Sequence, residues 1–259
     1  MSELQDLLDL GSEFLWSAFV VLLRAGAIVS LLPAFGERSI PARVRLGIAL
    51  AFVAIVLPGV REQIPERAIG IAAQISQLAP EIVTGLFFGL LVRFFIVGLQ
   101  IAGTIAAQST SLSQIFGGSA GVDPQPAIGQ VLFVAALALV CALGLHVDFA
   151  RYMILSYDLV PVSEALSPSL VADMGVAAVA HVFALAFSIS APFILSSLLY
   201  NITLGVINRA MPQLMVSFIG APAITAGGLA LLALASPLIL QVWISSLSEF
   251  MADPAGAFR

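Results

Sequence analysis

The chain has 259 residues, of which 60% are hydrophobic and 10% are charged, and its formal net charge is −5. A soluble domain carries about 25% charged residues, so this composition excludes a soluble protein and indicates an integral membrane protein. The basic residues form no patch, which excludes nucleic-acid binding, and the single cysteine, Cys141, excludes an internal disulfide or a CxxC metal site.

Six apolar segments are candidates to span a bilayer, which takes about 20 apolar residues each. The residues before the first segment are acidic rather than basic, so we expect no cleaved signal peptide. Pro192 and Pro237 lie in the last two segments, where we expect kinks. We predict an all-α, multi-pass membrane protein with kinked or broken helices and one domain, residues 1–259. The segments are residues 14–32, 44–60, 82–107, 128–147, 174–200 and 222–247.

The arginines that connect these segments give no clear orientation. If all six segments cross the bilayer, the two sides carry equal numbers of loop arginines, which is unusual under the positive-inside rule. The tie indicates that some segments do not cross as ordinary spans. One side carries Arg38, Arg43, Arg45 and Arg209, and the other carries Arg61, Arg67, Arg151 and Arg259.

The third segment places small and polar residues along one side of its predicted helix, at about 100° per residue. Two of its glycines form a GxxxG pair, which lets helices approach closely. The stripe fits either a helix buried in a bundle or a helix that lines an aqueous path or a subunit interface. It comprises Gly85, Gly89, Arg93, Gln100, Gly103 and Thr104, and Gln108 extends it.

The next loop, residues 109–122, is rich in Gly and Ser and nearly uncharged. Small residues disfavour a stable helix and permit tight turns. Since a solvated linker normally carries more charge, the loop is either a flexible connector or a segment packed inside the protein or its assembly, able to plug an opening and move.

No catalytic motif stands out, and neither an enzyme nor a cofactor is predicted. The two histidines are His146, which lies close to Asp148, and His181. A metal site needs three or four converging ligands, so we predict none. The acids lie mostly in loops or at segment ends, and Glu81 is the deepest of them. It follows Pro80, and charge placement at a helix N-terminus is favoured there over a proton relay.

The run Gly-Val-Ile-Asn-Arg-Ala-Met-Pro-Gln lies between the two longest uncharged stretches of the chain. Arg209, the only charge between those stretches, must face protein, water or headgroups. Pro212 resists continuing a helix. We interpret the run as a hinge in which Asn208 and Arg209 cap broken helix ends, with headgroup snorkelling of Arg209 as the alternative. Its residues are Gly205, Asn208, Arg209, Pro212 and Gln213.

This run, from Leu204 to Leu214, closely resembles the signature of the FliR family of flagellar proteins and their SctT-type injectisome counterparts. Three features depart from the family pattern: Leu145 interrupts a Gly-Gly-His element, Ser109 and Thr110 replace a Met-Gly pair, and Ala223 replaces a Lys. Further matches are Pro33, Phe35, Gly36, Pro41, Gln100 to Gly103, Gln108, Asp123, Pro124, Gly144, His146, Pro192, Gly220 and Pro222.

The resemblance implies a non-enzymatic subunit, without cofactors, of the type III secretion export gate in the bacterial inner membrane and flagellar basal body. It implies a helical, cone-shaped assembly with FliP-type and FliQ-type subunits, in contact with an FlhB-type switch protein, an FlhA-type subunit and membrane lipid. Unfolded secreted proteins would pass through its centre. The loop 109–122 would plug this channel, with gate residues Gln108, Ser111, Leu112, Ser113, Gln114, Ile115, Phe116, Gly117 and Gly118.

A small-solute permease with a midplane site near Arg209 is the alternative, because broken helices can bind an anionic substrate there. Such a permease is expected to contain inverted halves with a matched pair of interrupted helices. The sequence shows neither feature.

Overall fold

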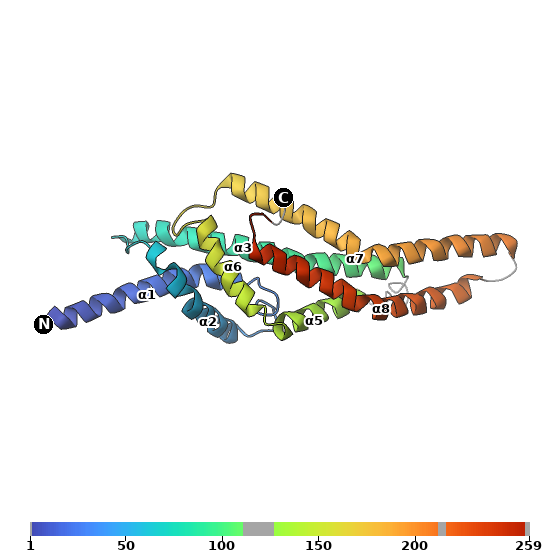
Figure 1. Cartoon of the computed structure of the whole chain (residues 1–259), viewed down its shortest axis with the longest axis horizontal. Helices are drawn as coiled ribbons and strands as arrows, with labels where there is room; N and C mark the ends of the chain where they lie inside the picture. Colours follow the sequence, from blue (N-terminus) through green and yellow to red (C-terminus); the bar gives the residue numbers. More distant parts are fainter. Residues whose placement is uncertain (1, 111–126, 212–215, 257–259) are drawn as a thin grey trace. The chain divides into compact units, whose positions relative to one another are not determined.

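The computed structural model describes residues 2–110, 127–211 and 216–256 (Figure 1). These residues form seven α-helices and one short 3-10 helix, without a strand. The predicted all-α class is therefore confirmed. The elements are α1 (Ser2–Val29), α2 (Ala42–Val60), η1 (Arg61–Gln63), α3 (Ile71–Ser109), α5 (Ala127–Ala142), α6 (His146–Leu159), α7 (Pro168–Ala210) and α8 (Val216–Ala252).

Five helical stretches among the described residues are long and apolar enough to cross a membrane, and α5 with α6 is a sixth candidate, bent by 83°. Each of the six segments predicted from the sequence overlaps one of these stretches. The chain is thus a multi-pass membrane protein, as predicted. The five stretches are Leu10–Val29, Ala42–Gln63, Ile71–Ser109, Pro168–Ala210 and Pro222–Ala252.

Helix α3 begins at Ile71, so Pro80 and Glu81 lie inside it, and the prediction that Glu81 follows a helix start is wrong. A proline in a helix interior costs about 3 kcal/mol, because it removes one hydrogen bond and its ring clashes with a carbonyl. The turns that follow Pro80 bury Glu81 and pack Gly85 against α1, and we attribute the continuity of the helix to these contacts. Pro58, Pro192, Pro222 and Pro237 also lie inside helices.

The break between α5 and α6 is built around Gly144. Its φ of 70° lies in the left-handed region, which a residue with a Cβ adopts at a cost. Three residues therefore suffice to end α5 at Ala142 and begin α6 at His146 in a new direction.

The described helices group into two compact units. Unit 1 comprises Met1–Phe94, Leu139–Val179 and Leu247–Arg259, and unit 2 comprises 95–138 and 180–246. The boundaries fall inside α3, α5, α7 and α8, which continue from one unit into the other. The single domain expected for the chain stays a prediction.

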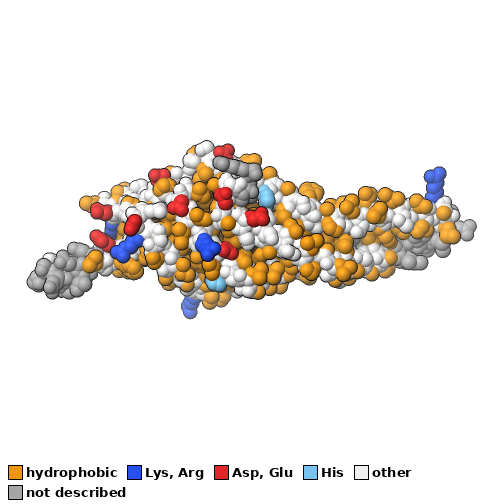
Figure 2. Space-filling view, viewed as in Figure 1, with side chains coloured by type: hydrophobic (Ala, Val, Ile, Leu, Met, Phe, Trp, Pro, Cys, Tyr) orange, Lys and Arg blue, Asp and Glu red, His pale blue; other side chains and the backbone are white. Residues whose placement is uncertain are grey.

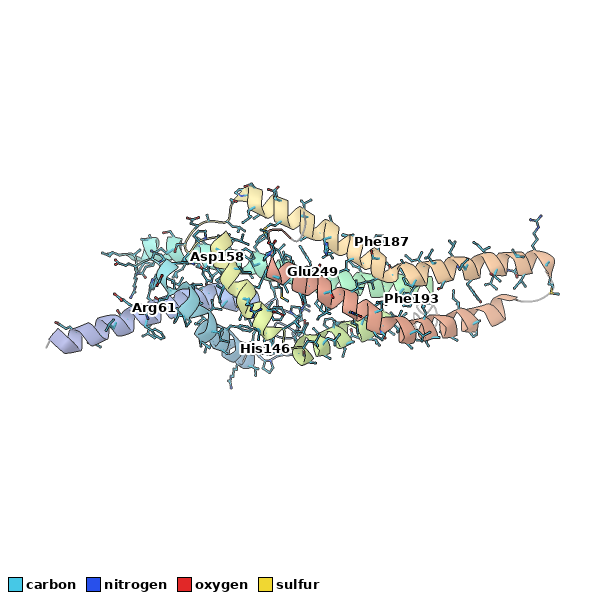
Figure 3. The ribbon with its side chains drawn as sticks, in the orientation of Figure 1. Arg61, His146, Asp158, Phe187, Phe193 and Glu249 are labelled. Atoms are coloured by element: carbon cyan, nitrogen blue, oxygen red, sulfur yellow. The ribbon has the colours of Figure 1, made fainter. Side chains whose placement is uncertain are left out.

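The two units carry different surfaces. Charged side chains gather over unit 1, whereas α7 and α8 in unit 2 present a mostly hydrophobic surface (Figure 2). Phe187 and Phe193 illustrate the two sides of α7, since Phe187 is 57% exposed and Phe193 is buried (Figure 3). The apolar surface of unit 2 must therefore be covered by lipid or by other chains.

Candidate functional site

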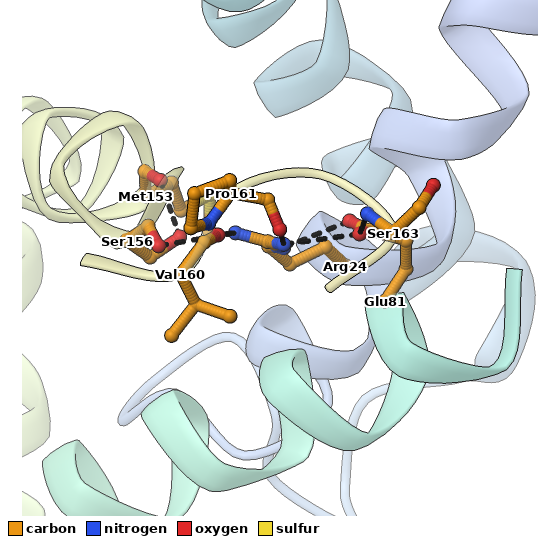
Figure 4. Close-up of polar contacts among 7 residues, drawn as sticks. All are labelled: Arg24, Glu81, Met153, Ser156, Val160, Pro161 and Ser163. Carbon is orange, nitrogen blue, oxygen red and sulfur yellow. Dashed lines mark hydrogen bonds and ion pairs between the residues drawn. The ribbon is translucent and has the colours of Figure 1, made fainter. Parts of the chain in front are cut away.

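Arg24 and Glu81 form a fully buried ion pair in unit 1 (Figure 4). Arg24 belongs to α1 and Glu81 to α3. The Nε atom of Arg24 donates to Oε2 of Glu81 at 2.8 Å, and Nη2 donates to Oε1 at 3.0 Å. This bidentate arrangement fixes the relative rotation of the two side chains as well as their distance.

The remaining donors of Arg24 cap the C-terminal end of α6. Nη1 donates to the carbonyl oxygens of Ser156 at 3.0 Å and Val160 at 2.8 Å, and Nη2 donates to that of Pro161 at 3.4 Å. A guanidinium has five N–H donors, and all five of Arg24 find an acceptor. The last carbonyls of a helix lack partners within it, so a buried helix end needs such donors.

The aromatic ring of Tyr157 and the loop after α6 complete the cluster. The Cζ atom of Arg24 lies 3.9 Å from the centroid of the Tyr157 ring. Oε1 of Glu81 also accepts a hydrogen bond from the backbone N–H of Ser163 at 2.8 Å, although Ser163 has a strained φ of 64°. The cluster thus fastens α1, α3 and the α6–α7 loop to one another.

The predicted stripe on α3 begins beside this cluster. A Cβ atom on Gly85 would lie 2.5 Å from the carbonyl oxygen of Arg24, and one on Gly89 would lie 3.1 Å from the Cα of Ile28. The two glycines therefore let α3 approach α1 closely. One helical turn further, Arg93 forms a half-buried ion pair with Glu37 of the α1–α2 loop.

In unit 2 the stripe continues against α5. A Cβ atom on Gly103 would clash with the Cα of Gly129, so the two backbones are in direct contact there. Thr104 donates to the carbonyl of Gln100 within α3 at 2.9 Å. Gln100 is half-buried, and Gln108 is exposed near the end of the helix.

The predicted plug residues 111–118 lie outside the described residues. The residue before them, Thr110, is buried, and its hydroxyl donates to the carbonyl of Ala106 at 3.0 Å. A Cβ atom on Gly228 of α8 would lie 2.5 Å from the Cγ2 atom of Thr110. The start of the predicted plug is therefore packed against α8.

The signature hinge falls at the end of α7. Gly205, Asn208 and Arg209 are exposed residues of its last turns, whereas Pro212 and Gln213 lie outside the described residues. Within the described part of the chain, Arg209 makes no hydrogen bond or ion pair. The sequence predicts that the Arg209 guanidinium binds several carbonyl oxygens. Arg24 makes contacts of this kind in unit 1.

The two histidines belong to different units. His146 is exposed at the start of α6 (Figure 3). In unit 2, the Nε2 atom of His181 is 2.8 Å from the hydroxyl of Ser246. Among the described residues, no three His, Cys, Asp or Glu side chains lie close enough to hold a metal ion. The glycines and charged residues of the stripe and of the Arg24 cluster pack helices against one another and form ion pairs.

Three residues that sequence reasoning did not single out prove central to the packing. Arg24 and Glu37 hold the two ion pairs on α3, and the buried Trp243 donates from Nε1 to the carbonyl of Phe95 at 2.8 Å. The sequence did contain a signal for Arg24, because it is the only charged residue inside the first apolar segment. Such a charge requires a buried partner, and Glu81 is the deepest acid available.

Comparisons with known proteins extend over nearly the whole chain. Residues 15–250 match the family described as bacterial export proteins, family 1. The chain is 32% identical over 238 residues to the flagellar biosynthetic protein FliR of Caulobacter vibrioides, covering 90% of this chain and 94% of that protein. It is 28% and 27% identical to the proteins of the same name from Bacillus subtilis and Escherichia coli, each over 85% of this chain and 84% of the relative.

Proposed function

Because the chain belongs to the bacterial export proteins, family 1, we propose that it is a non-enzymatic subunit of the gate through which unfolded flagellar proteins cross the bacterial inner membrane. The observation that carries this proposal is the length of the match, which leaves out only the ends of the chain. The relatives above are all named for flagellar biosynthesis, which favours a flagellar apparatus over an injectisome and disfavours the small-solute permease.

The length of the apolar helices supports an assembly with other chains. Helix α7 has 43 residues and measures about 65 Å along its axis at 1.5 Å per residue. Its exposed apolar side chains extend from Val171 to Ile207, which is about 54 Å of helix. The hydrocarbon core of a bilayer is about 30 Å thick, so a single lipid-facing span does not account for this surface. Partner subunits of the FliP and FliQ types would cover the remainder.

Copurification tests the proposed function. We expect the tagged full-length chain, extracted in mild detergent, to retain several copies of other small membrane proteins, and a strain without the chain to lose both flagellar secretion and motility. A chain that purifies alone or only with copies of itself, and that moves a small solute in vesicles, would instead support the permease.

The same preparation tests the hinge. We predict that Arg209→Ala reduces the partner proteins that copurify with the chain, because its exposed guanidinium would bind carbonyl or carboxylate groups of a neighbouring subunit. Arg151→Ala, which removes another exposed arginine, is the matched control and should leave the complex intact. Normal complex yield and normal secretion in Arg209→Ala would refute this role.

Deletion of Ser111 to Ser119 tests the plug. We predict a higher ion leak through the assembled gate, measured as loss of membrane potential in growing cells, because an uncharged segment can close a narrow lumen without a desolvation penalty. The leak should disappear when the FliP-type subunit is also deleted, since no channel then assembles. A deletion strain with an intact membrane potential and a correctly assembled gate would show that these residues do not close the channel.

A further inference from the structure

We propose that a groove on unit 1 binds an anionic phospholipid, with the lipid phosphate held by Arg45 and one acyl chain lying along α1 and α3. This phospholipid groove is bounded by α1, by the first turns of α2, and by the part of α3 around Ile82 and Leu86. Its volume is about 420 Å³. Ligand sites occupy roughly 300–1,000 Å³, so the groove accommodates part of a lipid. Its apolar wall includes Leu22, Leu23, Ala49, Ile82 and Leu86.

Arg45 is the charged group of the groove, and its hydrogen bonding is incomplete. Nη2 donates to the carbonyl oxygens of Glu37 at 2.9 Å and Ile40 at 3.5 Å, while the buried Nε has no hydrogen-bond partner. Among the described residues, no carboxylate forms an ion pair with Arg45, because that of Glu37 is bound to Arg93. Nη1 is not buried and donates to no described residue, so a phosphate oxygen bound there would gain a charge-assisted hydrogen bond and neutralise the charge.

The surroundings of the groove favour a lipid as the source of that phosphate. All three bounding helices are long and apolar enough to cross a membrane, so an acyl chain suits the apolar wall of the groove. Arg45 lies one turn inside α2, and the exposed Arg38 and Arg43 precede it, so this helix end is basic. Basic residues that flank a membrane span attract anionic headgroups.

Gly26 allows the groove to be closed without disturbing the fold. It lines the groove, and a Cβ atom placed on it meets no atom within 4 Å. Gly47 of α2 has the same open surroundings but does not line the groove. Gly26→Leu should therefore occupy the space of the acyl chain, and Gly47→Leu is the matched control with an equal added volume.

The test measures lipid that stays bound to the full-length chain and its copurifying subunits. The protein is held in detergent micelles doped with phosphatidylglycerol or phosphatidylethanolamine, and retained lipid is counted by native mass spectrometry. We expect the wild type to retain phosphatidylglycerol preferentially. Arg45→Gln should weaken this binding by roughly tenfold, Gly26→Leu should abolish it, and Gly47→Leu should retain it.

Three results would overturn the proposal, which does not depend on the export function. The first is equal retention of both lipids by the wild type, and the second is equal retention of phosphatidylglycerol by Gly26→Leu and Gly47→Leu. The third comes from a photo-reactive residue at position 26. Capture of a partner polypeptide, rather than a phospholipid, would identify the groove as a protein interface. Because Gly26→Leu leaves Arg45 intact, the test stands even if Arg45→Gln fails to fold.

Discussion

Replacing Arg24 with methionine is expected to lower the free energy of unfolding by about 3–5 kcal/mol, because Glu81 would remain buried without a counter-charge. The carbonyls at the end of α6 would also lose the donors that cap them. Native proteins are stable by only about 5–15 kcal/mol, so this loss should reduce the folded protein that accumulates in membranes. Thermal unfolding of the purified chain in detergent, followed by tryptophan fluorescence, measures the change.

Two controls separate this effect from the loss of any arginine. Arg151 and Asp148 form an exposed pair 4.0 Å apart, so Arg151→Met should change stability by less than about 0.5 kcal/mol. The double variant Arg24→Met with Glu81→Met removes both charges of the buried pair. Its loss in the free energy of unfolding should be smaller than the sum of the losses in the two single variants. Equal losses for Arg24→Met and Arg151→Met would show that the buried pair has no special role.

The second large effect is expected at the crossing of α3 and α5. Gly103→Ala would drive a Cβ atom into the backbone of Gly129, which cannot rotate away as a side chain can. The two helices must then separate, and we expect this overpacking to lower the free energy of unfolding by about 1–3 kcal/mol. Thermal unfolding of the purified chain in detergent, followed by tryptophan fluorescence, measures the change.

The opposite substitution is a control at the same contact. A Cβ atom on Gly129 would lie 3.6 Å from the carbonyl oxygen of Gln100 and 3.7 Å from the Cα of Gly103, which are ordinary contact distances. Gly129→Ala should therefore be neutral or slightly stabilising, since alanine suits a helix interior better than glycine does. If both alanine variants behave alike, the close crossing of the two backbones is not as the structure describes.

The sequence predicted the helices well because long apolar runs in a membrane protein have one stable backbone structure. It predicted their ends poorly. Hydrophobicity indicates where a helix contacts lipid or protein, whereas the helix itself ends where its backbone hydrogen bonds end. Helix α3 therefore begins at Ile71 and includes polar residues before the apolar segment. Pro80 was taken for a helix start, since the contacts that hold the helix together around it lie on α1.

The ion pairs were harder to predict than the helices. Arg24 and Glu81 are separated by 57 residues, and one sequence carries no information on which turns of two helices face each other. The stripe on α3 was predicted from its periodicity, but periodicity indicates a packed face and not which element packs on it. One arginine does bind several carbonyl oxygens in this structure, but it is Arg24, which the sequence analysis did not consider. The role predicted for Arg209 stays a prediction.

The separation of Arg24 and Glu81 along the chain has a consequence for biosynthesis. At about 5–20 residues per second, a ribosome makes Glu81 roughly 3 to 11 seconds after Arg24. During that interval the first helix carries an uncompensated cation and cannot settle at its final depth. Insertion of this protein is therefore expected to be reversible at first, and to become committed only when the third helix enters the membrane.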